Sequence, residues 1–393
     1  MSILWMKHGV RVYKPEKTCD GYTLISPYTR KDVWLIDMEG NYVHRWVMPT
    51  IPRNHGTLLP NGNLLYAMAA PLPPATDMRY PQIGGWGIGA GLIEVDWEGN
   101  EVWRYVDTHQ SHTFYRMENG NTIFPRVTKV PAELAPSLKG GIPGTEDRGM
   151  MWTDGICEVT ADGRVAWEWD MADHLDPDVH VLCPGCPRGD FTHMNSCVAL
   201  PDGNILAGFR NISTICIIDK VTGNIKWQWG PGEVSHQHDP TYLDNGNILL
   251  FDNGCHRQNG SLISYSRALE VNPATNKIEW EYKADPPQSF YSSIISSCQR
   301  LPNGNTLICE GTKGRVFEVT KEGGIVWEYV NPFYGPHGKR GAFIGWKHSN
   351  ALQCARRYTP DYLGLKGKAL NPPRDLDWVN RLYGPEAYGK NID

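Results

Sequence analysis

The sequence predicts an all-β fold, a six-bladed β-propeller, from two recurring phrases and from its composition. Turns that end in Gly-Asn recur at 59–63, 119–121, 200–204, 245–247 and 301–305. Between them, an alternating strand and a turn lead to a strand that carries Trp46, Trp103, Trp167, Trp227, Trp280 or Trp327. The two phrases together supply the four short strands of one propeller blade. The 41 Gly and 29 Pro, with no long stretch of helical periodicity, also favour strands and turns.

The blades follow one another along the chain, and the first is divided between its two ends. The strand at 348–354 has no Gly-Asn turn after it, whereas the N-terminus supplies a similar turn at 20–24. We therefore expect 20–46 and 347–358 to form one sheet, which leaves no open edge for other chains. The other blades are expected at 55–106, 112–170, 193–230, 238–283 and 294–330, in one domain, with 359–393 as a C-terminal extension. The Trp-bearing strands are expected to pack between blades.

Charge and hydropathy exclude several classes of protein. The net charge of −5 supplies no basic face for a nucleic acid. No run approaches the ~18 apolar residues of a membrane-spanning helix, so we expect no membrane span. Residues 1–8 lack the apolar core and cleavage site of a secretory signal, which predicts a cytoplasmic location. Ten Cys without a regular spacing fit reduced thiols rather than a disulfide framework.

Histidines recur at one position of the repeat, the entrance to the first strand of a blade. Five predicted blades carry one there, namely His55, His112, His193, His238 and His348. The sixth blade carries Ser296 and Ser297 instead. In a propeller these entrances surround the central channel on one face. The five imidazoles are therefore candidate catalytic residues, able to act as nucleophile or as acid and base near neutral pH.

Cationic side chains recur in the loops between second and third strands, which open on the same face. They are Arg126, Arg210, Arg257, Lys313 and Arg315. Guanidinium groups form paired hydrogen bonds with sulfate, phosphate or carboxylate, so we predict a site for a small anionic substrate. Two alternatives stay open. The same five imidazoles could hold a divalent metal in the channel, with Asp239 as a supporting carboxylate, or they could only fill the channel and bond strand ends.

Cys183-Pro184-Gly185-Cys186 is the single CxxC motif of the chain. A redox pair, a disulfide and half of a zinc site are the functional alternatives. No second CxxC and no paired His stands near it in the sequence, so a loop with incidental thiols is the favoured interpretation. The motif lies in the long insertion 171–192. Insertions of this length, of which 126–155 is another, are typical of lids or binding loops.

Two segments of the chain resemble the signature of bacterial arylsulfate sulfotransferases. One runs from Gln237-His238-Asp239-Pro240 to Phe251-Asp252-Asn253-Gly254 and is followed by Ser266-Arg267-Ala268-Leu269-Glu270. The other, Thr192-His193-Met194-Asn195-Ser196, is similar to the family's His-x-Asn-Ser motif. The resemblance extends from Gly21 to Trp327. It implies a six-bladed propeller that moves a sulfuryl group from a phenyl sulfate to a phenol through a sulfohistidine at the central channel.

The resemblance also implies roles for particular residues. His193 and His238 correspond to the family's two supporting histidines, with Asn195 in the same motif, and Arg257 corresponds to its sulfate-binding arginine. The family's nucleophilic His is expected within 309–315, where this chain has no His. The family's periplasmic signal is also missing. Candidates to replace the nucleophile are His256, His348 and His55.

The sequence thus predicts an arylsulfotransferase-like enzyme that acts on a small aromatic or anionic molecule by sulfuryl transfer or a related group transfer. One alternative is a hydrolase or lyase on the same propeller, which would use His acid–base chemistry or a His-bound metal. Another is a non-catalytic propeller that binds a partner. No cofactor is expected beyond that divalent metal, and no nucleic-acid partner is expected.

Overall fold

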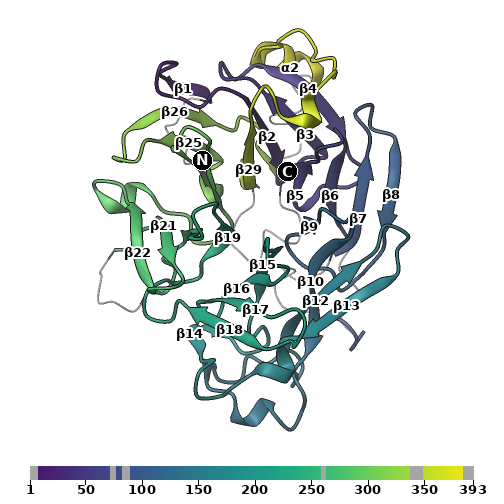
Figure 1. Ribbon diagram of the computed structural model, residues 1–393, viewed down its shortest axis with the longest axis vertical. Coiled ribbons are helices and arrows are strands. Elements are labelled where there is room, and N and C mark those ends of the chain that lie inside the picture. The colour runs from purple at the N-terminus through teal and green to yellow at the C-terminus, as the bar shows by residue number, and fades with distance from the viewer. Residues whose placement is uncertain (1–7, 71–76, 82–88, 258–262, 337–347, 384–393) are drawn as a thin grey trace. The chain divides into compact units, whose positions relative to one another are not determined.

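A computed structural model describes residues 8–70, 77–81, 89–257, 263–336 and 348–383. Over these residues the chain is nearly all β. Six sheets have four or five strands each, which is the six-bladed β-propeller arrangement that the sequence predicts (Figure 1). Contacts divide the chain into two compact units. The first comprises Met1–Tyr66, Ile93–Arg104 and Ile295–Asp393, and the second comprises Ala67–Leu92 and Tyr105–Ile294.

The first unit holds two complete sheets. One has the order β29-β2-β3-β4, with β2 (Tyr22–Pro27), β3 (Asp32–Ile36), β4 (Tyr42–Val47) and β29 (Leu352–Tyr358). The other has the order β1-β26-β25-β24-β23, with β1 (Gly9–Tyr13), β23 (Ser297–Arg300), β24 (Thr306–Glu310), β25 (Arg315–Val319) and β26 (Ile325–Val330). The sheet of β5 (Pro52–Leu58), β6 (Leu64–Ala69), β7 (Gly89–Val95) and β8 (Glu101–Tyr105) is divided between the units.

The second unit holds three sheets. The first contains β9 (Tyr115–Arg116), β10 (Thr122–Lys129), β12 (Trp152–Val159) and β13 (Val165–Asp170). The next contains β15 (Met194–Ala199), β16 (Ile205–Phe209), β17 (Thr214–Ile218) and β18 (Ile225–Trp229). The last contains β19 (His238–Tyr242), β20 (Ile248–Asp252), β21 (Arg267–Asn272) and β22 (Lys277–Tyr282). The two insertions meet in a parallel pair of β11 (Gly140–Ile142) and β14 (Leu182–Pro187).

The Gly-Asn turns recur because each one serves two purposes. The glycine has φ between 83° and 88° in all five turns, a left-handed conformation that suits glycine best. In four blades the following Asn donates from Nδ2 to a Glu of the third strand, at 2.6–2.7 Å. These pairs are Asn63 with Glu94, Asn121 with Glu158, Asn247 with Glu270, and Asn305 with Glu318. The repeated sequence therefore encodes both the turn and its attachment to the sheet.

Tryptophans of the fourth strands connect blades, as the sequence predicts. Nε1 of Trp169 donates to the carbonyl of Gly223 at 2.8 Å, in the outer turn of the next blade of the second unit. In the first unit, Nε1 of Trp327 donates to the carbonyl of Met38 at 2.8 Å. Each indole thus buries its apolar body and still satisfies its polar group.

The C-terminal strand pairs with the N-terminal strand, as predicted. β29 lies antiparallel to β2, with Tyr358 opposite Tyr22 and Leu352 opposite Pro27 (Figure 1). One strand was not predicted: β1 adds a fifth strand to its sheet by pairing with β26. The C-terminal extension contains the short helix α2 (Leu376–Tyr383). Among the described residues, no helix is long and apolar enough to cross a membrane.

Each unit has its own apolar core. In the first unit, Trp34 stacks on Phe333 with ring centroids 5.6 Å apart, and Trp327 stacks on Tyr329. In the second unit, residues of the 126–155 and 171–192 insertions join the core, and Leu182 and Phe191 are fully buried there. The insertions are therefore folded parts of the second unit, and they bring the CxxC motif to its blades.

Candidate functional site

Three predicted histidines, His112, His193 and His238, lie near the starts of the blades of the second unit. His238 is the first residue of β19, His193 directly precedes β15, and His112 stands shortly before β9. All three are buried. His112 and His193 have φ of 49° and 54°, in the left-handed region that few non-glycine residues adopt. Such backbone strain gathers at functional sites, so these entrances are strong candidates for chemistry.

His193 is oriented by a carboxylate. Its Nδ1 is hydrogen-bonded to Oδ2 of Asp190. Because a carboxylate accepts, Nδ1 carries the proton and Nε2 keeps its lone pair. The ring of His112 packs edge-on against that of His193, with centroids 4.6 Å apart. The sequence analysis did not single out Asp190, which comes from the 171–192 insertion. A carboxylate-held imidazole of this kind serves acid–base or nucleophilic catalysis in many enzymes.

His238 is held in its neutral form. Its Nδ1 donates to Oδ1 of Asn253 at 2.7 Å and to the carbonyl of His236 at 3.2 Å. Burial lowers the pKa of His238 well below its ordinary value, and the positive charge of Arg210 acts in the same direction. Asn253 is fixed in turn, because its Nδ2 donates to the carbonyl of Ser292 at 2.8 Å. His238 therefore presents Nε2 as a hydrogen-bond acceptor at neutral pH.

The predicted arginines of this unit differ in how their charge is used. Arg126 forms ion pairs with two carboxylates, and Arg257, to which the resemblance gives the sulfate, pairs with Asp252 at 2.9 Å. Arg210 donates instead to the neutral amide Oδ1 of Asn211 at 2.7 Å. Within the described part of the chain, no carboxylate lies at ion-pair distance from Arg210. The positive charge most available to an anion is therefore that of Arg210.

Asn195, a predicted substrate ligand, joins two strands. It is buried, and its Nδ2 donates to the carbonyl of Gln237 at 2.8 Å. This bond links the first strand of one blade to the entrance of the next, where His238 lies. Asn195 therefore positions the backbone beside His238.

His55 and His348 belong to the first unit, and neither stands at a strand entrance. His55 lies inside β5, with its Nδ1 2.5 Å from Oδ1 of Asn54, and burial lowers its pKa to about 3. The prediction that His348 begins the closing strand is wrong. It lies exposed in β28 (His348–Ser349), which pairs with β27 (Gly335–Pro336), and β29 begins only at Leu352. The five histidines therefore do not share one register.

Lys313 and Arg315, also in the first unit, neutralise a buried carboxylate. Lys313 lies 2.6 Å and Arg315 3.1 Å from Glu310, which has no exposed side-chain surface. Arg315 also pairs with Glu328 at 2.7 Å. Since a buried carboxylate requires such partners, both cations have a structural role in this unit.

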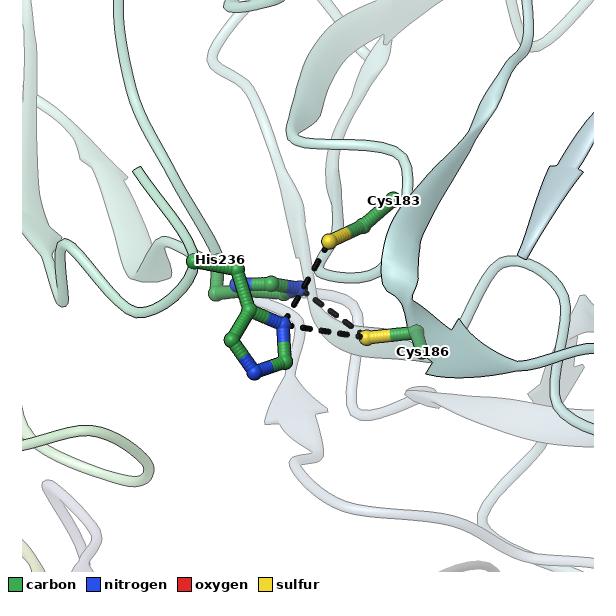
Figure 2. A group of neighbouring side chains, drawn as sticks. Cys183, Cys186 and His236 are labelled. Carbon is green, nitrogen blue, oxygen red and sulfur yellow. Dashed lines mark hydrogen bonds between the residues drawn. The ribbon is translucent and has the colours of Figure 1, made fainter. Parts of the chain in front are cut away.

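A group of sulfur and nitrogen atoms lies beside these histidines. It consists of Cys183, Cys186, His236 and His256, whose side-chain ligand atoms all lie within 4.8 Å of one another. Figure 2 shows the two sulfur atoms and the ring of His236 turned toward one small space. Hydrogen bonds from Cys186, His236 and His256 lower the pKa of the Cys183 thiol, and those from Cys183 and Cys255 raise the pKa of His256 to about 10. The group therefore favours thiolate sulfur.

The interpretation of the CxxC motif as a loop with incidental thiols overlooked these two histidines. His236 stands 50 residues after Cys186, and His256 stands 70 residues after it. Only the folding of the 171–192 insertion onto the second unit brings them together. His256, a candidate to replace the missing nucleophile, lies 3.4 Å from the sulfur of Cys183 through its Nδ1.

The fold and these residues define a class, a six-bladed β-propeller with oriented imidazoles beside an available guanidinium. The profile of the family described as Arylsulfotransferase (ASST) matches residues 75–332. The chain belongs to this family, as its sequence motifs predict.

Solved structures support the fold. A protein of unknown function from Bacteroides caccae has 14% sequence identity and a TM-score of 0.52, with 86% of this chain and 98% of that chain covered. A streptogramin B lyase has 13% identity and a TM-score of 0.46, with 82% of each chain covered. A virginiamycin B lyase from Staphylococcus aureus has 12% identity and a TM-score of 0.43, with 82% and 89% covered. No curated protein matches the sequence significantly.

Proposed function

We propose that the protein is an enzyme that transfers a sulfuryl group, or a closely related anionic group, between small aromatic molecules at the site around His193. Membership of the arylsulfotransferase family supports the class of reaction. The observation that carries the proposal is the Asp190–His193 pair, because a buried carboxylate-held imidazole is costly to maintain without a chemical use.

Each residue of the site has a distinct role in this proposal. Arg210 binds the anionic group through its guanidinium. Nε2 of His193 takes the proton from the acceptor hydroxyl, while Asp190 stabilises the imidazolium that forms. Neutral His238 accepts a hydrogen bond from the same hydroxyl and orients it. The family's carrier histidine has no counterpart in 309–315, so the proposal needs no covalent intermediate.

The chemistry balances in a direct transfer. The acceptor oxygen forms the new S–O bond as the S–O bond to the donor phenolate breaks. The proton that His193 removes from the acceptor then neutralises the departing phenolate. Charge on the transferred group stays with its sulfonate oxygens, which Arg210 holds throughout.

The test is turnover of 4-nitrophenyl sulfate with a phenol acceptor, followed by release of 4-nitrophenol. His193→Ala should lower kcat by roughly 10² or more, and Asp190→Asn should lower it by less because the imidazole remains. His174→Gln is the control, since His174 stacks on Trp169 and bonds none of these residues. No sulfated histidine should be found by mass spectrometry. Near-normal turnover in His193→Ala would refute the proposal, and release of nitrophenol without any acceptor would identify a hydrolase instead.

A further inference from the structure

The four ligand atoms beside the candidate site converge from three separate loops. Cys183 and Cys186 come from β14, His236 from the approach to β19, and His256 from the loop after β20. Sγ of Cys186 lies 3.3 Å from Nε2 of His236 and 3.8 Å from Nδ1 of His256, and Sγ of Cys183 lies 3.4 Å from the same Nδ1. Convergence of this kind indicates a common partner at the centre.

The distances match the edges of a tetrahedron of zinc ligands. Zinc–sulfur bonds of about 2.3 Å and zinc–nitrogen bonds of about 2.0–2.1 Å place tetrahedral ligand atoms about 3.3–3.8 Å apart. We propose that Cys183, Cys186, His236 and His256 bind one zinc ion in a closed, four-coordinate site. The assignment rests on the ligand geometry and is independent of the proposed function.

The surrounding backbone holds the ligands in place. Nδ1 of His236 donates to the carbonyl of Cys255 at 2.6 Å, which leaves its Nε2 with the lone pair that a metal needs. A Cβ on Gly185 would come within 2.8 Å of Nδ1 of His256, so the CxxC turn accepts this ring only with glycine there. His236 and His256 have φ of 60° and 58°, a strained conformation for histidine that functional sites tolerate.

Burial argues for a metal rather than for a disulfide. His236 has no exposed surface and Cys186 is 3% exposed. A Cys183–Cys186 disulfide would remove the thiol beside Nε2 of His236 and leave a buried polar nitrogen without a strong partner. Zinc satisfies both imidazole nitrogens and both sulfurs at once. Two thiolates with two imidazoles in a tetrahedral arrangement are also the donor set that selects zinc.

The site has a structural role next to the candidate catalytic residues. It attaches the 171–192 insertion, which carries Asp190, to the entrances of two blades of the same unit. Asn211 connects the two sites, since its Nδ2 donates to the carbonyl of Asp190 at 2.7 Å and its Oδ1 lies 3.9 Å from the sulfur of Cys186. Zinc would therefore fix the position of the insertion, and with it the orientation of Asp190.

The first experiment measures metal in the full-length wild-type protein purified without chelators. Elemental analysis should find about one zinc ion per chain. After metal removal, cobalt(II) added to the same protein should produce the intense visible bands of tetrahedral cobalt and a sulfur-to-cobalt charge-transfer band. A mercurial thiol reagent should release the zinc. These readouts do not depend on activity, so they fail separately from the proposed function.

The second experiment tests the ligands by substitution. Cys183→Ser and His256→Gln should each lower the zinc content to a small fraction of the wild-type value. Cys255→Ser should keep the zinc, because this residue supports the site through its backbone carbonyl. Wild-type protein that contains no zinc and gives no tetrahedral cobalt spectrum would overturn the proposal. A Cys183–Cys186 disulfide in the native protein, or loss of zinc from Cys255→Ser, would overturn this ligand set.

Discussion

Asp154 shows how burial sets the charge of single residues around the candidate site. Its side chain is 3% exposed, and its Oδ2 accepts from the hydroxyl of Thr192 at 2.7 Å and from the amide of Met194 at 2.6 Å. Burial raises the pKa of Asp154 to about 8, and the charge of Asp190 acts in the same direction. A neutral Asp154 leaves Asp190 without a second negative charge beside it, which suits its pairing with His193.

We expect Asp154→Asn to flatten the pH dependence of stability. A carboxyl whose pKa is higher in the folded state than its unfolded value of about 3.9 loses stability as pH rises from there through about 8. The wild-type unfolding free energy should therefore decline between pH 5 and pH 9, and the variant should decline less. Urea unfolding at pH 5, 7 and 9 measures this. The control is Asp173→Asn at an exposed position, and equal slopes for Asp154→Asn and wild type would contradict the assignment.

At the scale of the element, the Gly-Asn turn is stabilised by the strand that it faces. Asn247 is nearly buried, and its Nδ2 donates to Glu270 of β21 at 2.6 Å. The blade of β15–β18 lacks the corresponding Glu. There, Oδ1 of Asn204 accepts weakly from the amide of Lys220, at 3.4 Å. The same turn is thus attached strongly in one blade and loosely in another.

This difference predicts unequal effects of one substitution. Asn247→Ala should lower the unfolding free energy by about 1–3 kcal/mol, because Glu270 loses a donor in a nearly buried place. Asn204→Ala should cost distinctly less, although the turn sequences are alike. Chemical denaturation of both variants measures the two free energies. Equal losses would mean that the turn itself, and not its bond to the third strand, makes the contribution.

At the scale of the whole molecule, β29 ties the C-terminal part of the first unit to its N-terminal part. It covers the edge of β2 and carries Arg357, which pairs with Glu318 where both side chains are fully buried. The guanidinium also lies over the ring of Trp327, 4.4 Å from its centroid. Removing one partner of a fully buried ion pair costs about 3–5 kcal/mol, so this strand matters beyond its backbone bonds.

Two truncations separate the strand from the extension behind it. A chain that ends at Ala351 lacks β29, exposes the edge of β2 and leaves Glu318 without Arg357, so it should aggregate. A chain that ends at Tyr358 keeps the strand and loses only later contacts, such as the 2.9 Å bond from Tyr362 to the carbonyl of Leu58. Size-exclusion chromatography and light scattering compare them. Equal solubility of the two chains would contradict the role given to β29.

Local chemistry explains which features could be predicted. Asn-Gly turns and Trp-bearing strands repeat at similar spacing, so the blades and the β2–β29 pairing were visible in the sequence. His193 and His238 were found because they precede such turns. Asp190 was missed because it lies in an insertion outside the repeat. The alignment of His348 with the other histidines was wrong because similar turns do not impose one register on the residues before them.

The sequence by itself determined the strands, their turns and their order, because these depend on neighbouring residues and on alternation along the chain. Only the tertiary structure decided which charges are compensated and which ligands meet. Arg257 and Arg210 look equivalent in sequence, yet an ion pair with Asp252 distinguishes them. Likewise, Cys186 and His236 become neighbours only when the insertion packs onto its unit. Burial and long-range contact set these properties, and neither can be read from local spacing.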